Sequence, residues 1–346
     1  MTPHPLIAWL FALLLNGWQD PSAANPAAPA PPPPSVAKTS LLPTTMPYRL
    51  VSGLIVIDAA LGAGLPRPAA IDTGLPAVLL EAEAAKRLSL KSGEPHTIQS
   101  LYGPLEVADL PAQSIRLSQT MIDNMRVGAA ARMGVLSGRH PVDSPDLWLG
   151  TPLFEQLTVT LEPARSQVIF SAADAPMPPK APFVPFELKN GAMTVQAKAD
   201  GKETFSAIVD TGAFGLLIPA SVAAKLKLKP AAVVQVTLPD GKVGKVAEVT
   251  LKELAIGPMK FKDVRALYIT EGDPGPIGPY GIIGADLLLR HRVTFSFAQH
   301  RLAFEKPRPP EPVKPSRPRP ESKKSPARPP RAAPDKTTAP PSTSAP

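Results

Sequence analysis

Apolar and polar residues alternate with a period of two along much of this chain, and this pattern predicts β-strands rather than helices. Between residues 195 and 209, apolar residues stand at alternate positions on both sides of the dipeptide Asp200-Gly201. Alternation around an Asp-Gly pair is typical of a β-hairpin with a two-residue turn. Residues 56–71 show a related pattern with glycines at the expected turn. We therefore expect a hairpin in each of these stretches.

The two hairpins are part of an internal repeat. Residues 56–74 align with residues 194–212 without a gap, and each segment ends in Asp-Thr-Gly. Each hairpin should therefore deliver an aspartate at the end of a strand. A short helical pattern follows in both copies and includes Ala-Ala-Lys at 84–86 and at 223–225.

A second repeated stretch lies further along each copy. Residues 146–170 and 280–304 both contain a glycine, a short helical pattern and a hairpin, and the interval from Gly150 to Phe170 equals that from Gly284 to Phe304. The repeat predicts an all-β fold of two similar lobes related by pseudo-twofold symmetry, with one or two short helices in each lobe. We expect the lobes at 47–170 and 183–305, joined by the proline-rich linker 171–182.

Proline is concentrated near the two ends of the chain. Of its 346 residues 47 are proline, and the segment 306–346 alone holds 14. Proline-rich segments with few large apolar residues cannot bury enough surface to offset the entropy of ordering. We therefore expect an Ala/Pro-rich disordered linker at 25–46 and a disordered Pro/Lys/Arg-rich tail at 306–346.

The positive charge of the protein belongs mainly to this tail. The tail carries ten Lys or Arg and three Asp or Glu, hence +7 of the total of +8. A solubilising tether is the interpretation we favour, and contact with an anionic polymer or a membrane surface is the alternative. The tail has no aromatic residues between its basic ones, so no nucleic-acid site is expected.

The N-terminal segment predicts export. Residues 6–15 form an apolar run that is short for a membrane span but suits the core of a signal peptide, and small residues follow at 22–24. We expect a signal peptide at 1–24 and a periplasmic or extracellular protein. An uncleaved N-terminal membrane anchor and a buried helix are the alternatives, because no Lys or Arg precedes the apolar run.

Several kinds of chemistry find no support in the sequence. There is no cysteine, so disulfides, thiolate metal sites and a cysteine nucleophile are excluded. The five histidines have neither zinc-enzyme spacing nor a neighbouring glutamate, and no Gly-x-Ser-x-Gly or dinucleotide fingerprint occurs. We expect no metal and no cofactor.

The repeated motif resembles the lobe of an aspartic protease, most closely the retropepsin-like kind. In each copy a hydrophobic–Asp-Thr-Gly turn is followed by an apolar stretch, a flap-like hairpin and two hydrophobic residues before a glycine. The resemblance covers about residues 47–170 and 183–305. It implies two retropepsin-like β-barrel lobes in one chain, a polypeptide substrate and a monomer that acts as an aspartic endopeptidase.

The resemblance also implies a role for each residue of the two turns. Asp72 and Asp210 would share a proton and activate a water molecule between them. The supporting residues would be Thr73 and Thr211, which hydrogen-bond across the lobes; Gly74 and Gly212, which expose backbone N–H groups; the small Ala213; and Gly150 and Gly284, against which the turns pack.

Flap hairpins should cover the aspartates. In the first lobe residues 98–107 fit this role, with Tyr102 and Gly103 as candidate flap residues. In the second lobe Asp240 and Gly241 form the expected tip of a hairpin.

The first lobe departs from the family pattern directly after its Asp-Thr-Gly. Leu75 stands where a Ser or Ala is usual, and Pro76 lacks a backbone donor. Leu75 would either crowd the site or point into the core. Two alternatives to a two-aspartate enzyme therefore remain open: a non-catalytic protein that binds peptides, and an enzyme that uses only the second lobe as a homodimer.

Overall fold

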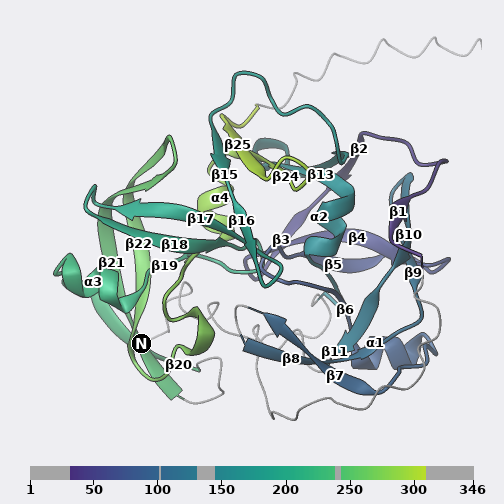
Figure 1. Ribbon diagram of the computed structural model, residues 1–346, viewed down its shortest axis with the longest axis horizontal. Coiled ribbons are helices and arrows are strands. Elements are labelled where there is room, and N and C mark those ends of the chain that lie inside the picture. Colours follow the sequence, from purple (N-terminus) through teal and green to yellow (C-terminus); the bar gives the residue numbers. More distant parts are fainter. Residues whose placement is uncertain (1–31, 101–102, 131–144, 238–242, 309–346) are drawn as a thin grey trace, which may run out of the picture. The chain divides into compact units, whose positions relative to one another are not determined.

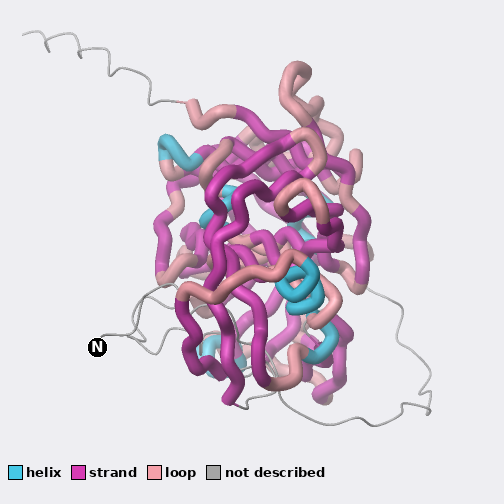
Figure 2. Tube along the Cα trace, turned by 90° about the vertical axis from the view of Figure 1, so that its left-hand side faces the viewer, coloured by secondary structure: helices cyan, strands magenta, loops and turns pink. Residues whose placement is uncertain are grey.

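The protein was analysed as a computed structural model that describes residues 32–100, 103–130, 145–237 and 243–308 (Figure 1). The expected signal peptide, Tyr102, Asp240, Gly241 and the chain from residue 309 lie outside these ranges. The chain divides into two units, residues 1–310 and 311–346, and all described residues belong to the first. Strands make up most of the described trace, and the helices among them are short (Figure 2).

The first lobe is built on an eleven-stranded sheet. Its strand order is β1-β10-β9-β4-β5-β12-β6-β11-β8-β7, and β3 pairs with β4. The strands are β1 (Ser35–Val36), β3 (Arg49–Val51), β4 (Leu54–Leu61), β5 (Arg67–Ile71), β6 (Val78–Glu81), β7 (Pro95–Ser100), β8 (Gly103–Asp109), β9 (Gln113–Leu117), β10 (Thr120–Met125), β11 (Val127–Ala130) and β12 (Leu147–Leu149), with helices α1 (Ala82–Arg87) and α2 (Thr151–Gln156).

The second lobe repeats this plan in an eight-stranded sheet of order β16-β17-β18-β23-β19-β22-β21-β20. Its strands are β16 (Glu187–Lys189), β17 (Ala192–Ala199), β18 (Glu203–Val209), β19 (Leu216–Leu217), β20 (Ala232–Thr237), β21 (Val243–Ile256), β22 (Met259–Glu271) and β23 (Gly281–Ile283), with helices α3 (Ala220–Lys225) and α4 (Ala285–Leu288) and the 3-10 turn η3 (Gly275–Ile277). The expected hairpin around Asp200-Gly201 is present, because β17 and β18 pair from Thr194↔Ile208 to Ala199↔Glu203.

A third sheet is shared by both lobes. Its strands are β2 (Thr44–Pro47), β13 (Leu157–Glu162), β14 (Gln167–Ala172), β15 (Phe183–Pro185), β24 (Arg292–Ser296) and β25 (Arg301–Glu305), in the order β15-β25-β24-β13-β14-β2, and the 3-10 turn η2 (Pro163–Arg165) joins β13 to β14. At its centre β13 pairs with β24 in antiparallel register (Figure 1).

This central pairing carries the pseudo-twofold axis. Thr160 lies directly opposite Thr294, and their hydroxyl groups are 2.8 Å apart. The interval between the two threonines along the chain equals that between Gly150 and Gly284, so each is the repeat counterpart of the other. The predicted all-β fold of two pseudo-symmetric lobes with short helices is therefore confirmed.

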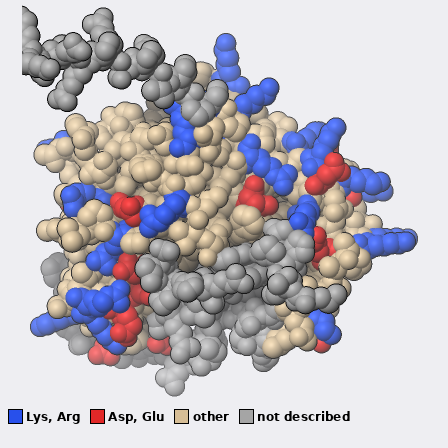
Figure 3. Space-filling view, turned by 180° about the vertical axis from the view of Figure 1, so that it is seen from behind, with Lys and Arg blue, Asp and Glu red and all other residues tan. Residues whose placement is uncertain are grey.

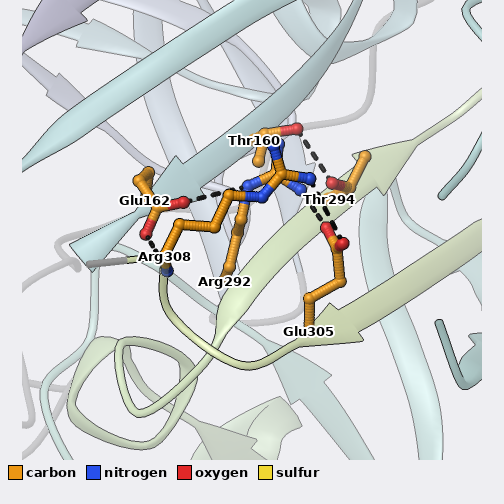
Figure 4. Close-up of polar contacts among 6 residues, drawn as sticks. All are labelled: Thr160, Glu162, Arg292, Thr294, Glu305 and Arg308. Atoms are coloured by element: carbon orange, nitrogen blue, oxygen red, sulfur yellow. Dashed lines mark hydrogen bonds and ion pairs between the residues drawn. The ribbon is translucent and has the colours of Figure 1, made fainter. Parts of the chain in front are cut away.

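Beside this axis lies a buried ion cluster drawn in Figure 4. The Arg292 guanidinium lies 3.1 Å from the Glu162 carboxylate, which is 2% exposed, and it also contacts Glu305. Arg308 completes the cluster, because its backbone N–H donates to Glu162 at 3.1 Å and its side chain reaches Glu305. The Arg292 guanidinium thus lies between a carboxylate of the first lobe and one of the second.

Apolar packing also joins the lobes. Phe154 in α2 meets Phe295 in β24 edge to face, with ring centroids 5.9 Å apart. Phe297 lies 5.7 Å from the same Phe154 ring, and aromatic pairs at such distances add to the gain from apolar burial. The two lobes therefore share one hydrophobic core across the third sheet.

The domain boundaries need correction at three places. The linker expected at 25–46 contains β1 and β2, which pair with β10 and β14, so it is not disordered over its second half. These strands were missed because two to four residues are too few for a period to show. The expected linker 171–182 starts inside β14, and the expected tail includes Arg308, which contacts the ion cluster.

Acidic and basic side chains of the described residues are interspersed on the face seen in Figure 3. Ion pairs such as Lys245–Glu271 and Arg265–Glu248 join neighbouring strands of the second lobe. None of the helices within the described ranges has the length and hydropathy needed to cross a membrane.

Candidate active site

The two Asp-Thr-Gly turns begin where β5 and β18 end. Each of these strands pairs in parallel with a later strand, β12 in the first lobe and β23 in the second. The backbone N–H of Asp72 donates to Leu149 and that of Asp210 to Ile283, both at 3.0 Å. The same main-chain bond therefore fixes the start of each turn.

The turns bring Asp72 and Asp210 into contact. Their side chains are joined by a hydrogen bond, and both residues are buried, with exposed fractions of 7% and 4%. Each carboxyl also accepts the N–H of its own turn glycine, at 3.0 Å from Gly74 and 2.7 Å from Gly212. One residue from each copy of the repeat thus contributes to a single buried pair.

The pair raises the pKa of Asp72 well above its ordinary value. Burial is the largest cause because it disfavours the charged form, and the negative charge of Asp210 and the hydrogen bond between the two side chains act in the same direction. The N–H groups of Gly74 and Leu75 oppose this effect only in part.

Glycine is required in both turns because each carboxyl packs against the glycine of the other lobe. A Cβ atom on Gly74 would lie 2.6 Å from the carboxyl carbon of Asp210. A Cβ atom on Gly212 would come closer still to the Asp72 carboxylate. Any side chain at either position would therefore push the pair apart.

The threonines of the turns exchange hydrogen bonds across the lobes. The Thr73 hydroxyl accepts the N–H of Thr211 at 3.0 Å and donates to the carbonyl of Val209 at 2.7 Å. The Thr211 hydroxyl makes the matching bonds with Thr73 and with Ile71, at 3.0 and 2.7 Å. Both side chains are fully buried, so these four bonds tie the turns together without competition from water.

Gly150 and Gly284 stand at the starts of α2 and α4 and pack on the turns. A Cβ atom on Gly284 would lie 2.6 Å from the backbone nitrogen of Gly215, and one on Gly150 would overlap the carbonyl of Ala77. The next residue in each lobe donates its N–H to the turn, because Thr151 and Ala285 bond to the carbonyls of Leu75 and Ala213 at 2.8 Å.

Comparison with known families identifies part of this arrangement. Residues 195–287 match the model of the family described as "Aspartyl protease". The segment 195–287 is therefore similar to aspartyl proteases. The matched segment contains Asp210, Thr211 and Gly212 and extends past Gly284. The resemblance seen in the sequence is confirmed by this match.

The search of curated proteins returned no match. Among solved structures, the protein is similar to the aspartic proteinase from Irpex lacteus, with 17% sequence identity and a TM-score of 0.49. The similarity covers 76% of this chain and 97% of that one.

In the first lobe, Leu75 points into the core and does not crowd the carboxyls. It is 2% exposed and belongs to an apolar cluster with Leu79, Leu105 and Trp148. Ala213 occupies the matching place in the second lobe and belongs to a separate cluster. The hairpin residue Leu105 thus helps to hold the first turn.

The residues after Leu75 and Ala213 make a second set of contacts between the lobes that the sequence did not suggest. Gly191 packs against Pro76, and Gly53 packs against Phe214, where an added Cβ would lie 2.6 and 3.0 Å from the opposing side chain. Both glycines have positive φ, +74° and +86°. They stand as far apart along the chain as the two Asp-Thr-Gly turns, which is the signal that could have revealed them.

The expected flap hairpins are present as strand pairs. In the first lobe β7 pairs with β8 down to Ser100↔Gly103, which puts Gly103 at the tip end of the hairpin with φ +121°. In the second lobe β20 pairs with β21 from Ala232↔Glu248 to Thr237↔Val243. The tip residues Tyr102, Asp240 and Gly241 lie outside the described residues.

Asp286 is a residue of the site region that the sequence did not single out. Its carboxylate accepts the N–H of Gly215 at 3.1 Å, in the loop that follows Asp210. Burial raises its pKa above the ordinary value, although backbone N–H groups and Arg290 act in the opposite direction. Over the described ranges, no group of three or more His, Asp or Glu side chains is placed to hold a metal ion.

Proposed function

We propose that the protein is an aspartic endopeptidase in which Asp72 and Asp210 together activate water for peptide-bond hydrolysis. The family match and the fold suggest aspartic-type peptidase activity, and the observation that carries the proposal is the contact between the two buried carboxyl groups. Two carboxyl groups in contact in a buried site cannot both ionise cheaply, so we expect the pair to hold one proton. The pair then contains an acid and a base at the same pH.

These two states suit the two proton transfers of hydrolysis. The ionised aspartate takes a proton from water as the water oxygen bonds to the peptide carbonyl carbon, and the protonated aspartate gives its proton to the carbonyl oxygen. When the tetrahedral intermediate breaks down, the C–N bond breaks and the nitrogen leaves with a proton from the pair. The glycine and threonine bonds hold both carboxyls in place, so little reorganisation is needed at the moment of reaction.

The two alternatives, a peptide-binding protein and a homodimer that uses only the second lobe, have less support than the two-aspartate enzyme. A non-catalytic peptide-binding protein was suggested by Leu75 and Pro76, but Leu75 is buried beside the hairpin and Pro76 makes the same kind of contact as Phe214. A homodimer that uses only the second lobe was the other alternative. Because Asp210 meets Asp72 of its own chain, we propose a monomeric enzyme.

The test is cleavage of an unstructured protein between pH 3 and 7, with and without a statin-type inhibitor. We expect cleavage that the inhibitor stops, and a fall in kcat of about 10³-fold or more in Asp72→Asn and in Asp210→Asn. Activity that survives either substitution would exclude a two-aspartate mechanism. Tight peptide binding without turnover would favour the binding protein, and sedimentation of the active species as a dimer would exclude the monomer.

A further inference from the structure

Asp286 holds the loop that follows the second Asp-Thr-Gly turn. Its carboxylate accepts the N–H of Gly215, while the Gly215 carbonyl accepts the N–H of Gly284 at 2.9 Å. Gly215 is therefore fixed at both of its backbone groups by the residues that start α4. Its φ of +103° is one that L-residues rarely adopt but glycine adopts readily, so a glycine at this position lets the loop take this shape.

This loop leads directly to the aspartate pair. Ala213 lies just before Phe214 and Gly215, and its N–H approaches the Asp210 carbonyl at 3.4 Å while its carbonyl accepts the N–H of Ala285. Gly212 precedes it, donates to the Asp210 carboxyl and packs against the Asp72 carboxyl. A shift of the loop would therefore move Gly212 relative to both carboxyls.

The first lobe has no counterpart to this carboxylate. By the interval that relates Gly150 to Gly284, the position of Asp286 corresponds to Pro152, which has no acceptor in its side chain. Ala77 stands at the position of Gly215. The first turn is instead packed by Leu75 in its apolar cluster, whereas the smaller Ala213 fills less space in the second. The second turn is thus held by the hydrogen bond from Gly215 to Asp286 and by the smaller apolar contact of Ala213.

We propose that Asp286 is a positioning residue: by accepting the Gly215 N–H, its carboxylate holds the 212–215 loop so that Gly212 stays seated against the aspartate pair. The inference rests on the proposed function, since the pair is its target. Asp286 does not contact the reacting atoms. It acts through Gly215 and Gly212. The required property is an oxygen that accepts the hydrogen bond, and the negative charge is not needed.

Three variants test this role: Asp286→Ala, which removes the acceptor; Asp286→Asn, which keeps one; and Pro152→Ala, the matched change at the same helix position of the first lobe. Active sites are counted by titration with a tight statin-type inhibitor, so that kcat refers to folded enzyme only. We expect Asp286→Ala to lower kcat by about 10-fold or more while KM changes by less than about threefold. Asp286→Asn and Pro152→Ala should keep kcat within about threefold of the wild type.

The opposite results would overturn the proposal. A kcat within threefold of the wild type in Asp286→Ala would show that the bond does not position the pair. An equal loss in Asp286→Asn would show that charge, not the acceptor, is required. If Asp286→Ala does not fold, Asp286→Ser supplies the same comparison, because its shorter side chain does not reach Gly215.

Failure of the proposed function looks different. Wild-type protein without activity at any pH would remove the enzyme and leave the geometry to be tested by stability. The buried pair makes unfolding pH-dependent, and Asp286 adds its own contribution because burial raises its pKa. Asp286→Ala and Asp286→Asn both lack that contribution, so they are compared with each other, and we expect the weaker pH dependence in Asp286→Ala. An equal dependence in the two variants would contradict the positioning role even in an inactive protein.

Discussion

At the scale of single residues, the aspartate pair is held by contacts that cross between the lobes. Each carboxyl lies against the turn glycine of the opposite lobe, and each threonine hydroxyl bonds to the opposite backbone. Each Asp-Thr-Gly turn therefore makes its threonine bonds and its carboxyl–glycine packing only when the other turn is present. This explains why the motif occurs twice at matched positions.

The raised pKa of Asp72 predicts how stability depends on pH. An acid whose pKa is higher in the folded state favours folding below its unfolded value, near pH 4, and loses that contribution as pH rises through the folded value. Asp72→Asn removes this loss, so it should be more stable than the wild type at neutral pH, by about 1–3 kcal/mol. Thermal unfolding from pH 3 to 8 measures the effect.

The control for this experiment is Asp58→Asn, because Asp58 is exposed and pairs with Arg49 on the surface. It should change stability by less than about 1 kcal/mol and leave the pH dependence as in the wild type. The contrary result is a wild-type protein that gains stability steadily from pH 4 to pH 8 and to the same degree as Asp72→Asn. That result would show that the pKa of Asp72 is not raised by burial.

Gly212→Ala should separate the two carboxyls. The added methyl group would overlap the Asp72 carboxylate, and a displacement of about 1 Å at a reacting centre costs about 10²-fold in rate. We expect kcat to fall by that factor or more. Gly201→Ala is the matched control, since a Cβ there meets nothing within 4 Å and the change should lower stability without lowering kcat. Equal kcat values in the two variants would show that Gly212 is not needed for space.

Much of the pair was predictable at this scale, and its surroundings were not. Asp72, Asp210 and the threonines follow from a repeated tripeptide, which is a local signal. The direction of Leu75 depends on β8, a strand that comes later in the chain, and the sequence left it open. The sequence did not point to Asp286, because its partner is the backbone N–H of Gly215 and the residue type of Gly215 does not indicate that bond.

At the scale of elements, the shared third sheet joins the lobes. Its central strands meet at Thr160 and Thr294, and the Glu162–Arg292 pair lies next to them in the same register (Figure 4). A charge buried with its partner is tolerated, but one left alone is expensive. The ion cluster should therefore be sensitive to the loss of a single member.

Arg292→Ala should lower the free energy of unfolding by about 3–5 kcal/mol, because it leaves the buried Glu162 carboxylate without its guanidinium partner. The double variant Glu162→Met, Arg292→Leu removes both charges and should recover most of that loss. Arg49→Ala, in an exposed pair, should cost less than about 1 kcal/mol. Urea unfolding measures all three, and similar values for Arg292→Ala and Arg49→Ala would contradict a buried cluster.

The elements found from the sequence are those with local signals. The hairpin β17–β18 was predicted from alternation and an Asp-Gly turn, and helices α1 to α4 from short helical patterns. The edge strands β1 and β2 fell in an expected linker, since each is defined by the strand it pairs with rather than by its own residues. The sharing of one sheet between lobes is likewise a product of pairing between distant segments.

At the scale of the whole molecule, Arg308 is the last described residue, and it contacts Glu162 and Glu305 of the ion cluster. Removal of residues 309–346 should leave stability and cleavage as in the full chain. Removal from residue 307 onward also takes away Arg308 and should destabilise the body by about 1–2 kcal/mol, because Glu162 loses a donor. Unfolding of both truncated proteins tests this, and equal stabilities would show that Arg308 does not contribute.

The whole account depends on two aspartates from different lobes that hold one proton between them. The most direct measurement is the pH profile of kcat/KM for peptide cleavage by the full chain, compared with Asp210→Asn. A coupled pair predicts a bell-shaped profile, because activity needs one aspartate ionised and the other protonated, and it predicts that Asp210→Asn abolishes the profile altogether. A profile that rises with a single titration to a plateau, or one that persists in Asp210→Asn, would contradict the account.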